Sequence, residues 1–381
     1  MYPVSQAFHT AVRNNAPQMA LFVFPDGVIT NEDIDIEQGI SFRDYFCTKD
    51  DIGIGEALSN ELDFRLMNER QKLNDFPFGE CYALLGVQIG HGTGTGELML
   101  SYGGHTWRGS SAAGRRLTKD GVAVSGQPGF NPASLAAMDN KVYCFGTNGE
   151  AYAVLAGTGA QTSVPVNAFM IDKAKRFAGN TYSYQIDSNQ HKILTIRRNT
   201  GYVDTYEFCP LGYFNVERPK VTDDIQIDIH ANDRMLRFTS DMSGVGITYP
   251  KTLKEILTAI CNSEGVTLET DSFLNMNVQV ASAPEQFETC TKRDVIGWIA
   301  EAAGYNAKIS RDGGLKFVWL NNNTGQSFSE TGYTECRPYC YQTPRVNKLS
   351  VRNTSAGTET IVKPDGEDGK TAYLIQDNPF L

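Results

Sequence analysis

Closely spaced aspartates are the residues in this sequence whose types could support hydrolytic chemistry. Asp33 and Asp35 lie two positions apart, so on a strand both carboxylates project from one face. Asp223, Asp224 and Asp228 form a second acidic group. Two carboxylates are sufficient for a glycosidase, which uses one as the acid and the other as base or nucleophile. The alternative is that both groups are solvated strand and turn residues.

Histidine and cysteine could supply metal or nucleophilic chemistry, but neither residue type clusters along the chain. Among the five histidines only His91 and His105 share a segment, and it lacks a third zinc ligand. The closest cysteine pair is Cys336 and Cys340, with no second Cys or His pair nearby. We expect reduced thiols, no metal site, no cofactor and no catalytic residue.

The short motifs of metalloproteases, serine hydrolases and phosphate-binding loops are absent from the sequence. The glycine alternation over 90–96 lacks the lysine and the following helix that a phosphate site needs. We therefore expect 90–96 to form a flexible or tightly turned loop.

The elements that would position these residues are mostly strands. Helical spacing of apolar residues predicts a short helix over 4–12, whereas period-two alternation predicts strands. The strand predictions cover 19–24, 62–66, 182–186, 194–196 and 225–229.

The segment 86–160 differs from its surroundings in composition. It contains sixteen of the 36 glycines and little charge, so we expect loops and hairpins with few core residues. We also expect it to project from the first β domain and to gain order from a neighbouring subunit or partner.

Two helices of similar design are predicted in the segment 249–320. Thr252 and Thr291 can each cap a helix, and Glu255 and Asp294 follow three residues later. Glycines 265 and 304 can take the left-handed conformation that ends a helix. The apolar stripe of the second helix includes Trp298, which we expect to be buried. A hairpin is predicted between 307–309 and 315–318.

Length and charge limit the class of protein. A chain of 381 residues is long enough for roughly two to three domains with cores of their own. The formal net charge of −10 disfavours wrapping nucleic acid or docking on anionic lipid. No run of 18 apolar residues and no signal peptide is visible, so we expect no membrane anchor.

The order of motifs resembles that of bacteriophage tail hub proteins: the baseplate hub of contractile tails and the amino-terminal module of tail-associated proteins in flexible tails. The likeness covers almost the whole chain, and 249–318 is its most specific part. The residues that carry it are Asp26-Gly27 with Thr30–Ile34, Pro210–Phe214, Ala231–Met235, Tyr249-Pro250, Arg293–Ala300 with Gly304, Arg311–Leu315 and Ile375–Pro379.

The resemblance implies an α+β, mostly β fold with two tube-type β-barrel-like domains. The first would span 1–220 with the Gly-rich excursion 86–160, and the second 221–381 with the helical insertion 249–320. It also implies a homotrimeric, non-enzymatic ring in the virion tail tip that joins a six-fold tail tube to a three-fold spike or fibre. Expected partners are the distal tail or tube protein, the tape measure protein, a receptor-binding protein and, transiently, DNA.

The sequence therefore leaves three functions to be tested. The first is the structural hub, which acts in host attachment and genome ejection. Because such a ring surrounds the outgoing genome, we expect acidic or neutral side chains to outnumber Lys and Arg on its inner wall. The alternatives are a cell-wall glycosidase or peptidase that uses the aspartates above, and a carbohydrate-binding adhesin that uses 86–160.

Overall fold

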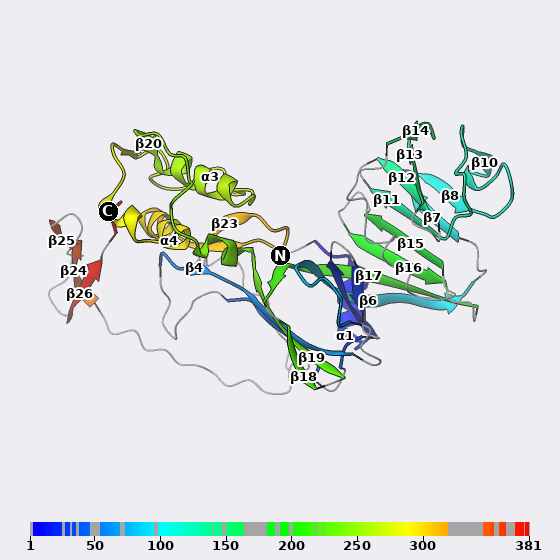
Figure 1. The fold of residues 1–381 in the computed structure, drawn as a ribbon, viewed down its shortest axis with the longest axis horizontal. Coiled ribbons are helices and arrows are strands. Elements are labelled where there is room, and N and C mark those ends of the chain that lie inside the picture. The colour runs from blue at the N-terminus through cyan, green and yellow to red at the C-terminus, as the bar shows by residue number, and fades with distance from the viewer. Residues whose placement is uncertain are drawn as a thin grey trace. The chain divides into compact units, whose positions relative to one another are not determined.

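The computed structural model describes most of the chain and divides it into two compact units. The units are Met1–Phe42 with Leu62–Ala231, and Arg43–Glu61 with Asn232–Leu381; each is described by itself (Figure 1). The described residues are 3–24, 27–30, 33–35, 38–45, 54–68, 73–94, 98–138, 140–146, 150–163, 181–186, 191–197, 201–217, 219–223, 225–318, 346–353, 358–362, 370–376 and 378–380.

Strands dominate the first unit and are the commonest regular structure over the described residues, which confirms the α+β, mostly β prediction. Where the structure describes the chain, no helix combines the length and the apolar character needed to cross a bilayer. The predicted first helix is present as α1 (Gln6–Arg13).

The first unit is built around a curved sheet in which two long strands, β6 (Glu80–Thr93) and β17 (Tyr202–Val216), pair along their whole lengths. The order across this part is β2-β1-β6-β17-β19-β5-β3, and β18 also pairs with β19. The bounds of the other strands are β1 (Gln18–Phe24), β2 (Gly27–Thr30), β3 (Ile40–Arg43), β5 (Glu61–Met67), β18 (Lys220–Asp223) and β19 (Gln226–Asp233).

Alternation along these strands creates one apolar and one polar face. Leu62, Phe64 and Leu66 of β5 are buried, as are Ile227 and Ile229 of β19. The predicted strands over 19–24 and 62–66 are therefore confirmed. The predicted strand over 225–229 begins one residue later, because position 225 lies exposed in the preceding turn.

The glycine-rich run is a strand up to Thr93, so the expected loop is wrong for residues 90–93. Residues 95 and 96 lie outside the described part. The strand forms because β17 supplies hydrogen-bond partners opposite Gly90 and Gly92, and these bonds outweigh the weak strand propensity of glycine.

The segment 86–160 also has a core of its own, so the expectation of few core residues is wrong. Trp107 is fully buried among apolar residues of this segment, including Leu98, Leu117, Leu135 and Val154. Many of the glycines lie in turns with positive φ, such as residues 103, 104, 121 and 126, so average composition hid the apolar alternation between them.

Short strands surround this core. The strands β10-β9-β8-β7 form a four-stranded sheet, and β14-β13-β12-β11-β15-β16 extend the large sheet to β17. Their bounds are β7 (Leu98–Tyr102), β8 (His105–Gly109), β9 (Leu117–Lys119), β10 (Val122–Ala123), β11 (Ser134–Met138), β12 (Lys141–Phe145), β13 (Ala151–Leu155), β14 (Gln161–Thr162), β15 (Thr181–Ile186) and β16 (Lys192–Arg197).

The second unit contains the two predicted helices, α3 (Leu253–Ser263) and α4 (Lys292–Ala303). Both capping boxes are formed, by Thr252 with Glu255 and by Thr291 with Asp294. The predicted hairpin is also present. The remaining elements are β4 (Ala57–Leu58), η3 (Arg234–Thr239), β20 (Lys251–Thr252), β21 (Gln279–Val280), η4 (Glu285–Glu288), β22 (Asn306–Ile309), β23 (Leu315–Val318), β24 (Val346–Asn353), β25 (Thr358–Val362) and β26 (Lys370–Gln376).

Trp298 is only partly buried, which corrects the prediction that it is a core residue. Helix α4 instead buries Ile296 and Gly297, because residues 54–57 cover a second side of the helix. A Cβ on Gly297 would lie 2.8 Å from the carbonyl oxygen of Gly55. This close approach widens the buried face of the helix to include residues 296 and 297, while Trp298 packs at the edge of the core.

Candidate functional site

Asp33 and Asp35, the first predicted aspartate group, lie beside β5 in the first unit. Asp33 and Asp35 flank a single-residue bridge from Ile34 to β5 and are partly buried. The Asp33 carbonyl accepts a hydrogen bond from the Met67 N–H over 2.7 Å. The Asp223 side chain and Asp224 lie outside the described residues.

A recess of about 390 Å³ lies over β5 and β19 and includes Asp228. Its polar side chains alternate with the core residues of these strands, so they all project from the face opposite the core. We name this surface the β5–β19 polar face and define it by Ser41, Asp63, Arg65, Lys220, Asp228 and His230.

Cross-strand ion pairs organise the polar face. Arg65 Nε lies 2.5 Å from Asp228 Oδ1, and His230 Nδ1 lies 2.6 Å from Asp63 Oδ1. Lys220 stands directly opposite Asp228 in the β18–β19 register. Arg65, Asp228 and Lys220 therefore form a row across β5, β19 and β18, with the carboxylate between the two cations.

This arrangement does not form a serine-hydrolase triad, although Ser41, His230 and Asp63 share the recess. In such a triad the histidine contacts both the serine and the aspartate. Here β5, which carries Asp63, lies between the strands that carry Ser41 and His230. Two strand spacings, roughly 10 Å, separate those outer strands.

The two histidines considered for zinc are each held by a separate aspartate. His91 Nδ1 lies 2.7 Å from Oδ1 of the buried Asp204, and the His91 ring stacks on Tyr202. His105 Nδ1 lies 2.7 Å from Asp120 Oδ2. The described residues contain no group of three or more His, Cys, Asp or Glu side chains placed to hold a metal ion.

Cysteine chemistry is suppressed wherever the structure describes a buried thiol. Burial raises the pKa of both Cys81 and Cys144 to about 12, so each remains a protonated thiol at neutral pH. Cys336 and Cys340, the pair considered for a metal, lie outside the described residues.

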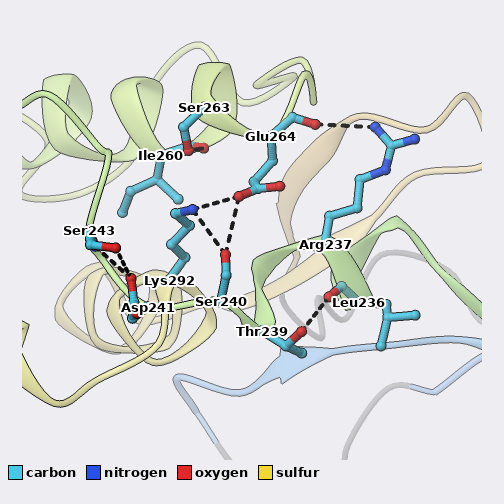
Figure 2. Close-up of polar contacts among 10 residues, drawn as sticks. All are labelled: Leu236, Arg237, Thr239, Ser240, Asp241, Ser243, Ile260, Ser263, Glu264 and Lys292. Carbon is cyan, nitrogen blue, oxygen red and sulfur yellow. Dashed lines mark hydrogen bonds and ion pairs between the residues drawn. The ribbon is translucent and has the colours of Figure 1, made fainter.

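A polar cluster in the second unit was not anticipated from the sequence. Figure 2 shows Lys292 from the start of α4 reaching Glu264 at the end of α3 and Ser240 after η3. Lys292 Nζ donates to Glu264 Oε1 over 2.6 Å and to Ser240 Oγ over 3.0 Å, and Arg237 donates to the Glu264 carbonyl. The two cations also lie favourably at the C-terminal end of the α3 dipole. The cluster therefore links α3, α4 and the residues of and after η3, and it stabilises their packing.

A second buried group ties residues 59–60 to η3. Asp233 is 2% exposed and accepts hydrogen bonds from the Asn60 N–H, the Ser59 hydroxyl and the Met235 N–H. Burial raises the pKa of Asp233 to about 6, although these donors and the Arg293 charge oppose the shift. Its motif, Ala231–Met235, was part of the resemblance, but nothing local in the sequence indicated its partners.

No family model matches the sequence, and the search among curated proteins also found no match. Among solved structures, the chain is similar to the crystal structure of the 43 kDa tail protein of prophage MuSo2 from Shewanella oneidensis. The sequence identity is 9% and the TM-score is 0.40, with 94% of this chain and 72% of that chain covered. A similarity this low assigns no role to any residue.

Proposed function

We propose that this chain is a structural hub of a phage or phage-like tail tip or baseplate. Three copies would form a ring that joins a six-fold tail tube to a three-fold spike or fibre and lets DNA pass. The observation that supports this most is in 249–318, the segment with the most specific resemblance. It folds as two capped helices followed by a hairpin, set between strand-rich regions.

In this proposal the two β regions act as tube-type domains, the first over 1–220 and the second over 221–381. Six such domains in a trimer would face the tail tube, whereas the other side of the ring would keep three-fold symmetry. The tube or distal tail protein and the tape measure protein would bind the former side, and a spike, fibre or receptor-binding protein the latter. The chain would be a component of the virion, assembled in the bacterial cytoplasm.

A non-enzymatic role is supported by how the candidate groups are engaged. Asp228 and Asp63 are paired across strands, and Asp33 and Asp35 lie where their backbones bond to β5. Asp204 is buried against His91 and Gln88. In this proposal these groups act as structural contacts.

The decisive experiment is the mass and symmetry of the purified chain. Light scattering should give three times the chain mass of 42.0 kDa, and negative-stain images should show a three-fold ring. A chain that remains monomeric at all concentrations tested would contradict the hub proposal. Release of fragments from purified peptidoglycan would favour the hydrolase, whereas glycan-array binding by the monomer would favour the adhesin.

A further inference from the structure

Three cations lie close together on the β22–β23 hairpin of the second unit. Lys308 and Lys316 stand directly opposite each other in the antiparallel register, and Arg311 lies in the turn that joins the two strands. The neighbouring strand residues Ala307 and Leu315 are fully buried. Because side chains alternate between the two faces of a strand, both lysines project from the face opposite the core.

The carboxylate of Asp44 bridges two of these cations. Its Oδ1 atom contacts Lys308 Nζ, and its Oδ2 atom lies 3.9 Å from Arg311 Nη2. Lys308 Nζ also donates a hydrogen bond to the Tyr45 carbonyl over 3.1 Å. The Lys308 side chain is 14% exposed, whereas those of Asp44 and Arg311 are 38% and 36% exposed. The Asp44 carboxylate therefore marks the place where an anionic oxygen reaches the cations from solvent.

Folding alone does not explain why the two lysines face each other. Like charges directly opposite on paired strands destabilise the pair. Burial is the largest cause that lowers the pKa of Lys308 to about 8, and the charges of Lys316 and Arg311 act in the same direction. Within the residues that the structure describes, the Lys316 ammonium has no hydrogen-bond or ion-pair partner. An added anion would relieve this repulsion.

We propose that Lys308, Arg311 and Lys316 form a binding site for an oxyanion, the carboxylate or phosphate group of a ligand. The ligand would bind Lys316 and Arg311 directly through charge-assisted hydrogen bonds, with Asp44 as its competitor for the cations. All these residues belong to the second unit, so the site does not depend on the proposed hub function. Two sources fit this chemistry: a free anion and an acidic segment of a partner protein.

The test measures the pKa of Lys308 in the full chain from the pH dependence of its acetylation by acetic anhydride, which mass spectrometry quantifies at each lysine. Inorganic phosphate replaces chloride at constant ionic strength, so that general screening stays fixed. We expect phosphate to raise the pKa of Lys308 in a saturable way, because a bound anion favours the charged amine. The acetylation of Lys251, which is paired with Glu255, should not change.

Two variants with opposite expected effects test the residues named. Lys316→Gln should weaken phosphate binding about five-fold, as expected for one lost charge-assisted contact at a partly exposed site. Lys251→Gln is its control, because it removes an equal charge elsewhere in the same unit. Asp44→Asn should tighten binding, because it removes the competing carboxylate and keeps the side-chain shape, whereas Glu288→Gln should not. Equal binding by the two lysine variants, or weaker binding by Asp44→Asn, would overturn the inference.

A second titration distinguishes the two sources of the oxyanion. A hexaglutamate peptide replaces phosphate at the same ionic strength, again with the pKa of Lys308 as the readout. Saturation at a lower concentration than for phosphate would assign the site to an acidic segment of a partner protein, whereas saturation by phosphate alone would assign it to a free anion. A pKa of Lys308 that neither probe changes would overturn the inference and leave the hub proposal standing.

Discussion

Asp233 shows how one buried carboxyl couples the stability of the second unit to pH. Its pKa is raised from an ordinary 3.8 to about 6, with burial as the largest cause. Between these values the native state holds a proton that the unfolded chain has released. The free energy of unfolding that this group contributes therefore falls as pH rises from about 4 to about 6, by about 3 kcal/mol at most.

We predict that Asp233→Asn removes this dependence, because an amide does not titrate. Chemical denaturation of the native chain and the variant at several pH values between about 4 and 7 measures it. The difference in unfolding free energy, native minus variant, should decrease as pH rises through the window. A constant difference would contradict the pKa shift. Asp312→Asn, at an exposed position, is the control and should leave the native pH profile unchanged.

At the scale of elements, helix α4 depends on a glycine contact that its own sequence does not reveal. Gly297 faces the carbonyl oxygen of Gly55 so closely that an added methyl group would lie 2.8 Å from it. Alanine is the better helix former by about 1 kcal/mol, so propensity alone would predict that Gly297→Ala stabilises the protein.

We predict the opposite sign, with a net loss of about 1–3 kcal/mol, because residues 54–57 must move off the helix. Thermal and urea denaturation measure this change. Gly246→Ala is the matched control, since nothing lies within 4 Å of an added Cβ there and it should be nearly neutral. Stabilisation by Gly297→Ala would show that the contact is absent in solution.

The core within 86–160 gives a second prediction at this scale. Trp107 is fully buried, so Trp107→Ala should cost about 3–5 kcal/mol and speed amide exchange in β11 and β12. The Trp107 Nε1 atom has no hydrogen-bond partner among the described residues, so Trp107→Phe should cost clearly less. Hydrogen exchange on the free chain measures the effect of each of the two variants. Fast exchange in the native free chain would restore the view that this segment needs a partner to become ordered.

At the scale of the whole molecule, the second unit is assembled from two distant pieces of chain. β4 pairs with β22 in parallel, and Arg293 donates two hydrogen bonds to the Ala57 carbonyl. The Gly55 N–H also donates to the Tyr305 carbonyl. Residues 43–61 therefore pack and fold with a region that begins more than 170 residues later in the sequence.

We predict that residues 232–381 expressed alone melt at a lower temperature than the second unit within the full chain. A synthetic peptide of residues 54–60 should raise that Tm in a concentration-dependent way, because it binds only the folded state. A peptide with Gly55→Val should fail, since its Cβ would lie 2.4 Å from the Glu301 Cβ and valine disfavours a φ of +84°. Equal effects of the two peptides would show that residues 54–60 do not dock as the structure has them.

The sequence by itself determined the elements whose signals are local. The caps at Thr252 and Thr291 lie three residues from their partners, and the alternation of Leu62, Phe64 and Leu66 sets one strand face. These patterns fixed the mostly β class and both helices, because the groups that interact are held together by a few covalent bonds.

Only the tertiary structure decided the contacts that define the candidate site and the partly exposed Trp298. The Asp63–His230 pair joins residues 167 positions apart, and the contact between Gly55 and Gly297 joins two parts of the chain. Such contacts depend on strand order and on which segment covers a helix. Both are set by the packing of the whole unit, for which residue spacing along the chain carries no signal.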